Sequence, residues 1–226
     1  MRSIFADSVG TLAALALISL AFAWIVGAHF SLPVLGAAAA AFFRYLPSTL
    51  GLLIVSFLIA ALVGFLVSLP ALRSVRPLIH AGVTALQCIP LFVLAIAIEI
   101  PAGFIFGVRS LYIGALVVLT IFQLPLTVAY HDAWLARGLT LRRAARSAAG
   151  ALARRFDENF PGILSASMIT EVIFAWRGEG RLLLAMVAYG PALSVVVFLF
   201  LIALLVLLIR TLAGVAARDD DGGEVA

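Results

Sequence analysis

The chain has 226 residues, of which 65% are hydrophobic and only 12% charged, and its mean hydropathy is +1.22. A water-soluble domain cannot bury that much apolar surface, so the composition excludes an ordinary soluble protein. The net charge of +4 does not indicate a nucleic-acid partner, because the basic residues, all arginine, fall mainly between apolar stretches. The single cysteine, Cys88, excludes an intrachain disulfide, a cysteine-ligated zinc cluster and a CxxC redox site.

Apolar stretches recur along the chain, and no polar block is long enough to fold by itself. A hydrocarbon core about 30 Å thick is crossed by roughly 20 apolar helical residues. Residues 1–217 therefore predict one all-α integral membrane domain with about six transmembrane helices. The expected spans, in chain order, are Val9–Ala28 (interpreted as a signal anchor), Thr49–Leu72, Leu78–Ile98, Leu111–Tyr130, Phe160–Trp176 and Pro191–Ile209.

Two other segments are not predicted to cross the membrane. Ser31–Phe43 is apolar but too short to cross a membrane, and it contains Pro33, so we expect an interfacial or re-entrant piece on the outer side. Residues 218–226 are acidic, contain glycine and lack apolar periodicity, which predicts an unstructured cytoplasmic tail.

The arginines predict the orientation, since cytoplasmic loops are enriched in basic residues. An N-terminus on the cytoplasmic side places eleven of the 15 basic residues inside and leaves only Arg44, Arg109, Arg177 and Arg181 outside. We therefore expect a multi-pass protein of the cytoplasmic membrane with its N-terminus inside.

The one substantial polar segment, residues 131–159, carries six arginines on the predicted cytoplasmic side. At about 100° per residue, a helix from Leu141 gathers leucines and alanines on one face. Its opposite face carries Arg142, Arg143, Arg146 and Arg154. Two interpretations stay open from these residues alone: a surface that binds a partner protein, and an amphipathic helix that rests on lipid headgroups.

Glu171 is the one acidic residue within the span Phe160–Trp176. A charge near mid-membrane costs at least about 3 kcal/mol unless it is paired or faces water, which makes this residue a functional candidate. The alternative, which its position favours, is that it lies near the outer end of a short helix and reaches water, Arg177 or Arg181.

Other polar residues inside the spans are candidates for a pathway or for hydrogen bonds between helices, chiefly Gln87 and Gln123. Pro90 and Pro125 remove backbone hydrogen bonds within spans, which favours kinks and local cavities. The three histidines are widely separated in sequence and predicted depth, so no metal site is expected.

The chain has no apparatus for catalysis or for an energy source of its own. It lacks a GxxxxGK(S/T) loop, so we expect no ATP site in this chain, and it has no clustered nucleophile, base or metal ligands, so we expect no enzyme. A gradient-driven pump normally carries several intramembrane carboxylates, whereas the spans offer Glu171 and the borderline Glu99. This favours a separate motor subunit.

The segment EVIFAWRGEGRLLLAM, Glu171–Met186, resembles the permease subunits of the dipeptide, oligopeptide and nickel type of ABC importers. That family carries a Glu, a following Phe, a Pro-Gly-x-Gly turn and an apolar helix. The matching residues here are Glu171, Phe174, Gly178, Gly180 and Leu182–Leu184. Arg177 replaces the usual Pro and Glu179 replaces the usual aliphatic residue.

Further similar stretches follow in the same order, so that the resemblance covers roughly residues 45–212. They are STLGLLIVSFLIAALVG in the second span, IPLFVLAIAI at Ile89–Ile98, LPLTVAY at Leu124–Tyr130, ARGLT at Ala136–Thr140 and PGILSASMITE from Pro161. The family's large outer domain after the first span is much reduced in this chain.

The resemblance implies a type I importer bundle in a prokaryotic inner membrane, forming half of a translocation pathway, with peptides as a candidate cargo. It also implies four kinds of partner: a second, homologous permease subunit, ATP-binding subunits that hold ATP and Mg, an extracytoplasmic binding protein, and lipid. The implied coupling helix contains Ala136, Arg137, Gly138, Arg142, Arg143 and Arg146. The alternatives are a gradient-driven carrier or channel with Glu171 as its coupling residue, and a non-transporting assembly or regulatory subunit.

Overall fold

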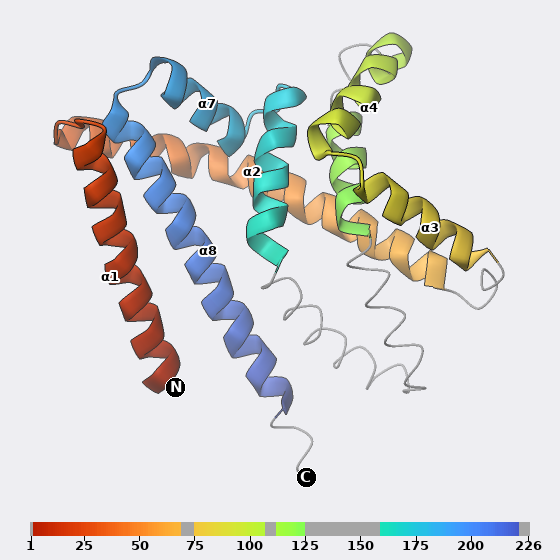
Figure 1. The fold of residues 1–226 in the computed structure, drawn as a ribbon, viewed down its shortest axis with the longest axis horizontal. Helices are drawn as coiled ribbons and strands as arrows, with labels where there is room; N and C mark the ends of the chain where they lie inside the picture. Colours follow the sequence, from red (N-terminus) through yellow and green to blue (C-terminus); the bar gives the residue numbers. More distant parts are fainter. Residues whose placement is uncertain (1, 69–74, 107–111, 125–158, 222–226) are drawn as a thin grey trace.

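The computed structural model describes residues 2–68, 75–106, 112–124 and 159–221, and within these ranges the secondary structure is helical, without a strand (Figure 1). The expected all-α fold is confirmed. The helices are α1 (Arg2–Ile25), α2 (Leu32–Ser68), α3 (Arg76–Gln87), α4 (Leu91–Phe106), α7 (Glu179–Tyr189) and α8 (Ala192–Asp221). Two further helical segments are Tyr112–Leu124 and residues 159–173.

Among the described residues, two helices are long and apolar enough to cross a membrane, α2 over Leu32–Val67 and α8 over Ala192–Leu212. Most of their side chains are not buried against the rest of the protein. The shorter apolar helices among the described residues are Gly10–Ile25, Leu91–Pro101 and Tyr112–Leu124.

The long helix α2 corrects the predicted division of this part of the chain. Ser31–Phe43 is not a separate interfacial piece, because it is continuous with the following span in a helix of 37 residues. Pro33 lies in the first turn, where its missing N–H has no intrahelical partner to lose, and Arg44 is exposed. At 1.5 Å per residue α2 is about 55 Å long, well above the roughly 30 Å of a hydrocarbon core.

The predicted span Leu78–Ile98 is also corrected, because the chain breaks between α3 and α4. Pro90 directly precedes α4, and its carbonyl accepts the N–H groups of Val93 (2.9 Å) and Leu94 (3.1 Å). Since a residue before proline is disfavoured in the helical region, Ile89 cannot easily continue α3. Pro90 therefore separates two helices instead of kinking one.

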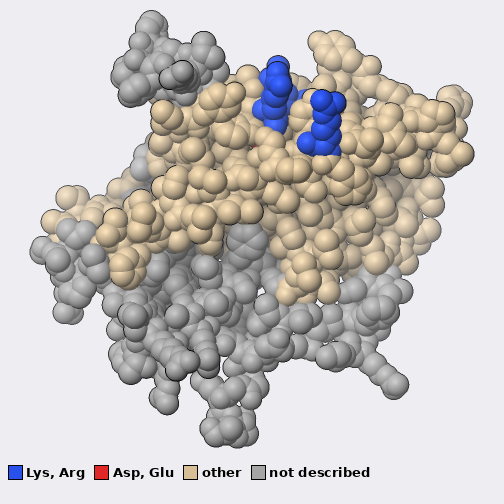
Figure 2. All heavy atoms as spheres, turned by 180° about the vertical axis from the view of Figure 1, so that it is seen from behind, with Lys and Arg blue, Asp and Glu red and all other residues tan. Residues whose placement is uncertain are grey.

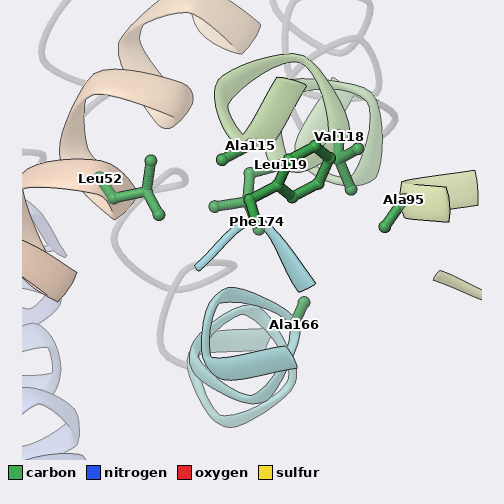
Figure 3. Packing of buried hydrophobic residues seen from close by; sticks show 7 residues of the cluster. All are labelled: Leu52, Ala95, Ala115, Val118, Leu119, Ala166 and Phe174. Atoms are coloured by element: carbon green, nitrogen blue, oxygen red, sulfur yellow. The ribbon is translucent and has the colours of Figure 1, made fainter. Parts of the chain in front are cut away.

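Three clusters of buried hydrophobic residues hold the helices together, and α2 contributes to all three. The first groups Leu52 of α2 with Ala95 of α4, Ala166 and Phe174 and with side chains of Tyr112–Leu124, as Figure 3 shows. In the second, Phe42 of α2 packs edge-on against Phe198 of α8 (ring centroids 5.6 Å apart). The third joins Leu53 to the start of segment 159–173.

The first and last helices, α1 and α8, pack against each other and run side by side in Figure 1. The short helix α7 contacts both α2 and α8. Helix α8 continues to Asp221, so residues 218–221 of the predicted tail are helical.

Candidate functional site

The site begins where segment 159–173 ends and the chain turns toward α7. The Trp176 N–H donates to the Glu171 carbonyl (2.9 Å) and the Ala175 N–H to the Val172 carbonyl (3.4 Å). These are the two bonds of a Schellman motif, in which the residue at the Ala175 position is left-handed. Ala175 indeed has φ 52°, an uncommon conformation for a residue with a side chain. The turn thus reverses the chain and brings Gly180 back onto Glu171.

The Glu171 carboxylate lies at the centre of this turn and is fully buried. Its Oε2 accepts the Gly180 N–H (2.7 Å), and its Oε1 accepts the Ser167 hydroxyl (3.5 Å). Gly180 is the second residue of α7, whose N-cap Gly178 has no side chain to offer. Glu171 therefore caps α7 from a neighbouring helix, at the end where a helix dipole favours negative charge.

Close backbone approach requires the two glycines of the turn. A Cβ on Gly178 would overlap the Glu171 carboxyl group, and a Cβ on Gly180 would overlap the backbone carbonyl of Met168. The φ of Gly178 is −144°, which any residue can adopt, so a side chain there is disfavoured because it would displace the Glu171 carboxyl group and not because of backbone conformation. The Gly-x-Gly pattern is thus explained by the chain packing against itself.

Glu179, between the two glycines, is a second fully buried carboxyl group. Its N–H donates to the Thr49 hydroxyl of α2 (2.8 Å), which is also a hydrogen-bond neighbour of the Glu171 carboxylate. Neither carboxyl oxygen of Glu179 has a hydrogen-bond partner among the described residues. Burial, together with the nearby Glu171 charge, raises the pKa of Glu179 to about 8.

Aromatic side chains anchor the turn on both sides. Phe174 is buried in the cluster of Figure 3, and its ring fills the space where Gly114 lacks a side chain. The Trp176 indole N–H donates to the Ser48 hydroxyl of α2 (2.8 Å). The Trp176 ring also meets Tyr112 edge-on, with centroids 4.8 Å apart. The turn is therefore fixed to α2 and to Tyr112–Leu124.

Glu171 was expected near the end of a short helix, which is confirmed, and in contact with water or an arginine, which is wrong. Glu171 does lie in the last turn of a short helix, but it is buried and bonded to the backbone instead of reaching water or an arginine. Arg177 is exposed, and Arg181 donates to the Ala175 carbonyl (2.9 Å). Figure 2 shows basic side chains grouped on one otherwise uncharged face of the described protein.

Gln123 lies in a separate polar contact. Its Nε2 donates to the Ser56 hydroxyl of α2 (2.7 Å), and its Oε1 is buried without a partner within the described ranges. Thr120 also donates to the Ser56 carbonyl (3.5 Å). Gln123 thus makes a hydrogen bond between helices, one of the two roles expected for it.

The remaining predicted site residues are not brought together with Glu171. Gln87 is the last residue of α3, and Pro90 is an exposed residue between α3 and α4. Within the described parts of the chain, no three histidine, cysteine or acidic residues are placed to hold a metal ion. The other predictions lie outside the described residues: Pro125, Ala136, Arg137, Gly138, Arg142, Arg143 and Arg146.

Sequence reasoning missed Glu179 as a site residue and treated it as a departure from a family pattern. The signal that could have found it is an acidic residue enclosed by two glycines, eight positions after another acid in an apolar region. Comparison with known proteins adds no family, because no protein-family model and no curated protein matches the chain. The resemblance to importer permeases therefore stays a prediction.

Proposed function

We propose that this chain is the transmembrane permease subunit of an ATP-driven importer. It forms half of a translocation pathway with a second permease subunit and couples to separate ATPase subunits. The observation that carries the proposal is the joint role of the residues behind the family resemblance. Glu171, Gly178 and Gly180 contact one another in one turn, and Phe174 anchors that turn in the core.

The surface of the long helices supports insertion in a membrane. Large apolar side chains of α2 are widely exposed, including Leu58 (61%) and Leu62 (60%), and α8 exposes Leu208 (54%). A water-soluble monomer rarely exposes such a continuous apolar surface, whereas lipid or a second permease subunit would cover it favourably. We place the chain as a multi-pass protein of a prokaryotic inner membrane, with its N-terminus inside.

The position of the turn suggests how a motor could act on the pathway. Residues 131–159 are the proposed coupling loop, and segment 159–173 leads directly from that loop to Glu171. A helical segment of this length spans roughly 22 Å. Movement of the loop by ATPase subunits would then be transmitted along this segment to the turn and, through Thr49 and Ser48, to α2.

A pull-down tests this assignment. We would purify tagged chain from its native host in mild detergent and compare it with a loop variant carrying Gly138→Arg, Arg142→Glu and Arg143→Glu. We expect an ATPase subunit to copurify with the unmodified chain and to be lost from the loop variant. Arg177→Glu, which reverses an exposed charge on the predicted outer side, is the matched control and should retain the subunit.

A gradient-driven carrier is the second candidate, because Glu179 adds another buried carboxyl beside Glu171. Such carriers use intramembrane carboxylates to couple ions to transport. A chain that purifies alone and catalyses gradient-driven flux in liposomes would replace the importer proposal with this one. Normal assembly with transport unaffected by the loop variant would instead favour an assembly or regulatory subunit.

A further inference from the structure

Glu179 is a buried carboxyl group for which the proposed transport function assigns no role. Its side chain is inaccessible to solvent, and its two oxygens have no hydrogen-bond partner in the described part of the chain. An ionised carboxylate in such surroundings loses its hydration without compensation, which costs far more than burying the neutral acid. This geometry therefore favours a protonated Glu179.

The neighbouring charge acts in the same direction. Glu171 faces Glu179 from segment 159–173, and its carboxylate is already committed to the Gly180 N–H (2.7 Å) and the Ser167 hydroxyl (3.5 Å). Two like charges in one water-poor site repel, so only one of the pair ionises readily. Glu171 accepts donors at its carboxylate, including a helix N-terminal amide, whereas the Glu179 carboxyl has no donor in the described structure, so of the two Glu179 holds the proton more readily.

No cation from the surrounding elements neutralises Glu179 in the described structure. Helix α2 contributes the uncharged Thr49, and α8, which packs against α7, has no charged residue between Ala192 and Ile209. The other charged residues of α2, the turn and α7 are exposed, namely Arg44, Arg177 and Arg181.

We propose that Glu179 is a proton-binding site whose occupancy closes the turn between segment 159–173 and α7. Two adjacent backbone amides hold the closed turn. The Glu179 N–H donates to the Thr49 hydroxyl, and the Gly180 N–H donates to the Glu171 carboxylate. Loss of the proton leaves a second negative charge buried next to Glu171. The start of α7 then moves away so that the ionised Glu179 reaches water, which removes the repulsion and the cost of burial. The ligand is a proton, and the inference does not depend on the proposed transport function.

The direction of the pH dependence follows from linkage. A solvated Glu179 in an open turn has the ordinary pKa of 4.5, whereas in the closed turn its pKa is about 8. Between these two values the closed turn holds a proton that the open turn has released, so closure weakens as the pH rises. Below the lower value and above the upper value both forms carry the same charge on Glu179, and closure no longer changes with pH through this group.

Infrared difference spectroscopy of the full chain in detergent tests the protonation. We would titrate from about pH 4 to about pH 10, a range that covers ordinary and raised carboxyl pKa values. We expect a carboxylic-acid band that is lost with a midpoint close to pH 8, that is absent in Glu179→Gln, and that persists in the matched control Glu99→Gln. A Glu179 band that is lost near the ordinary value of 4.5 overturns the proposal.

Trp176 donates a hydrogen bond to Ser48 beside the turn, so its fluorescence reports closure of the turn. In a Trp24→Phe, Trp134→Phe background, its emission should shift over the same pH range, and Glu179→Gln should hold the low-pH emission throughout. A shift that survives Glu179→Gln overturns the link to closure.

If Glu179→Gln does not fold, Glu171→Gln serves instead, since removing the repelling charge should lower the midpoint. An unchanged midpoint in that variant contradicts the proposal, as does a midpoint that depends on sodium versus choline as the added cation.

Discussion

Segment Tyr112–Leu124 and the end of segment 159–173 each bury a polar side chain beside α2, but the two contacts are built differently. Gln123 donates to Ser56 from one neutral side chain to another, and its Oε1 stays unpaired. Glu171 instead accepts a backbone N–H at the start of a helix, next to Thr49, which lies two turns before Ser56 on α2.

The difference shows what a buried carboxylate demands of its surroundings. A neutral amide can be left partly unsatisfied at moderate cost, so Gln123 needs only one donor–acceptor pair. A charged carboxylate needs strong donors, and here the start of α7 comes so close that a Cβ at position 180 would overlap backbone and one at position 178 would overlap the carboxyl group itself. The Glu171 turn should therefore tolerate change much less than the Gln123 contact.

Gly180→Ala should cause the largest loss of stability. The added Cβ would overlap the backbone carbonyl of Met168, which cannot rotate away as a side chain could. We expect a loss of about 3 kcal/mol, the upper part of the usual range for overpacking. The thermal midpoint in detergent should then fall by roughly 6–12 °C for a chain of this length.

Gly51→Ala is the matched control for this effect. Gly51 lies in α2 between Thr49 and Ser56, and a Cβ there meets nothing within 4 Å. Because alanine is the better helix former, the control should be neutral or stabilised by up to about 1 kcal/mol. Equal losses from the two substitutions would contradict the close packing of the turn.

Smaller losses of stability are expected when each of the two polar contacts is removed in turn. Glu171→Leu leaves the Gly180 N–H buried without its acceptor, and we expect a cost of about 2 kcal/mol. Gln123→Leu removes the unpaired Oε1 together with one bond to Ser56, so its cost should be about 1 kcal/mol or less.

Chemical denaturation of both variants in the same detergent measures this comparison. Glu171→Gln, which keeps an acceptor for Gly180, should recover most of the loss caused by Glu171→Leu. If Gln123→Leu proves the more damaging change, the carboxylate does not hold the turn as the hydrogen bonds indicate.

The same contrast explains which parts of the site could be predicted. Glu171 could be singled out from the sequence because an acidic residue in an apolar stretch is costly anywhere in a membrane. Its partners could not, because they depend on a left-handed Ala175 that folds Gly180 back onto the helix. Glu179 was missed for that reason, since only the reversed chain brings the two carboxyl groups into one buried site.

The fold shows a similar division between pattern and context. The apolar runs predicted helices correctly at α1, at α8 and over the second half of α2, since a helix pairs the backbone groups of an apolar segment internally. The consequences of proline were harder to predict: Pro33 lies harmlessly in the first turn of α2, while Pro90 separates α3 from α4. A sequence pattern does not reveal whether a proline falls in a first turn or between helices.

The smallest expected effect is that of Ala175→Gly, which sharpens the description of the turn itself. A left-handed alanine costs about 1–2 kcal/mol, and glycine removes this strain while losing more backbone entropy on folding. We expect a net stabilisation of about 0.5 kcal/mol, seen as a rise of roughly 1–2 °C in the thermal midpoint. Ala185→Gly, at an exposed position inside α7, should instead destabilise by about 1 kcal/mol. The opposite signs are the decisive result, because a loss at both positions would mean that Ala175 is not left-handed and that the chain does not reverse onto Glu171 in this way.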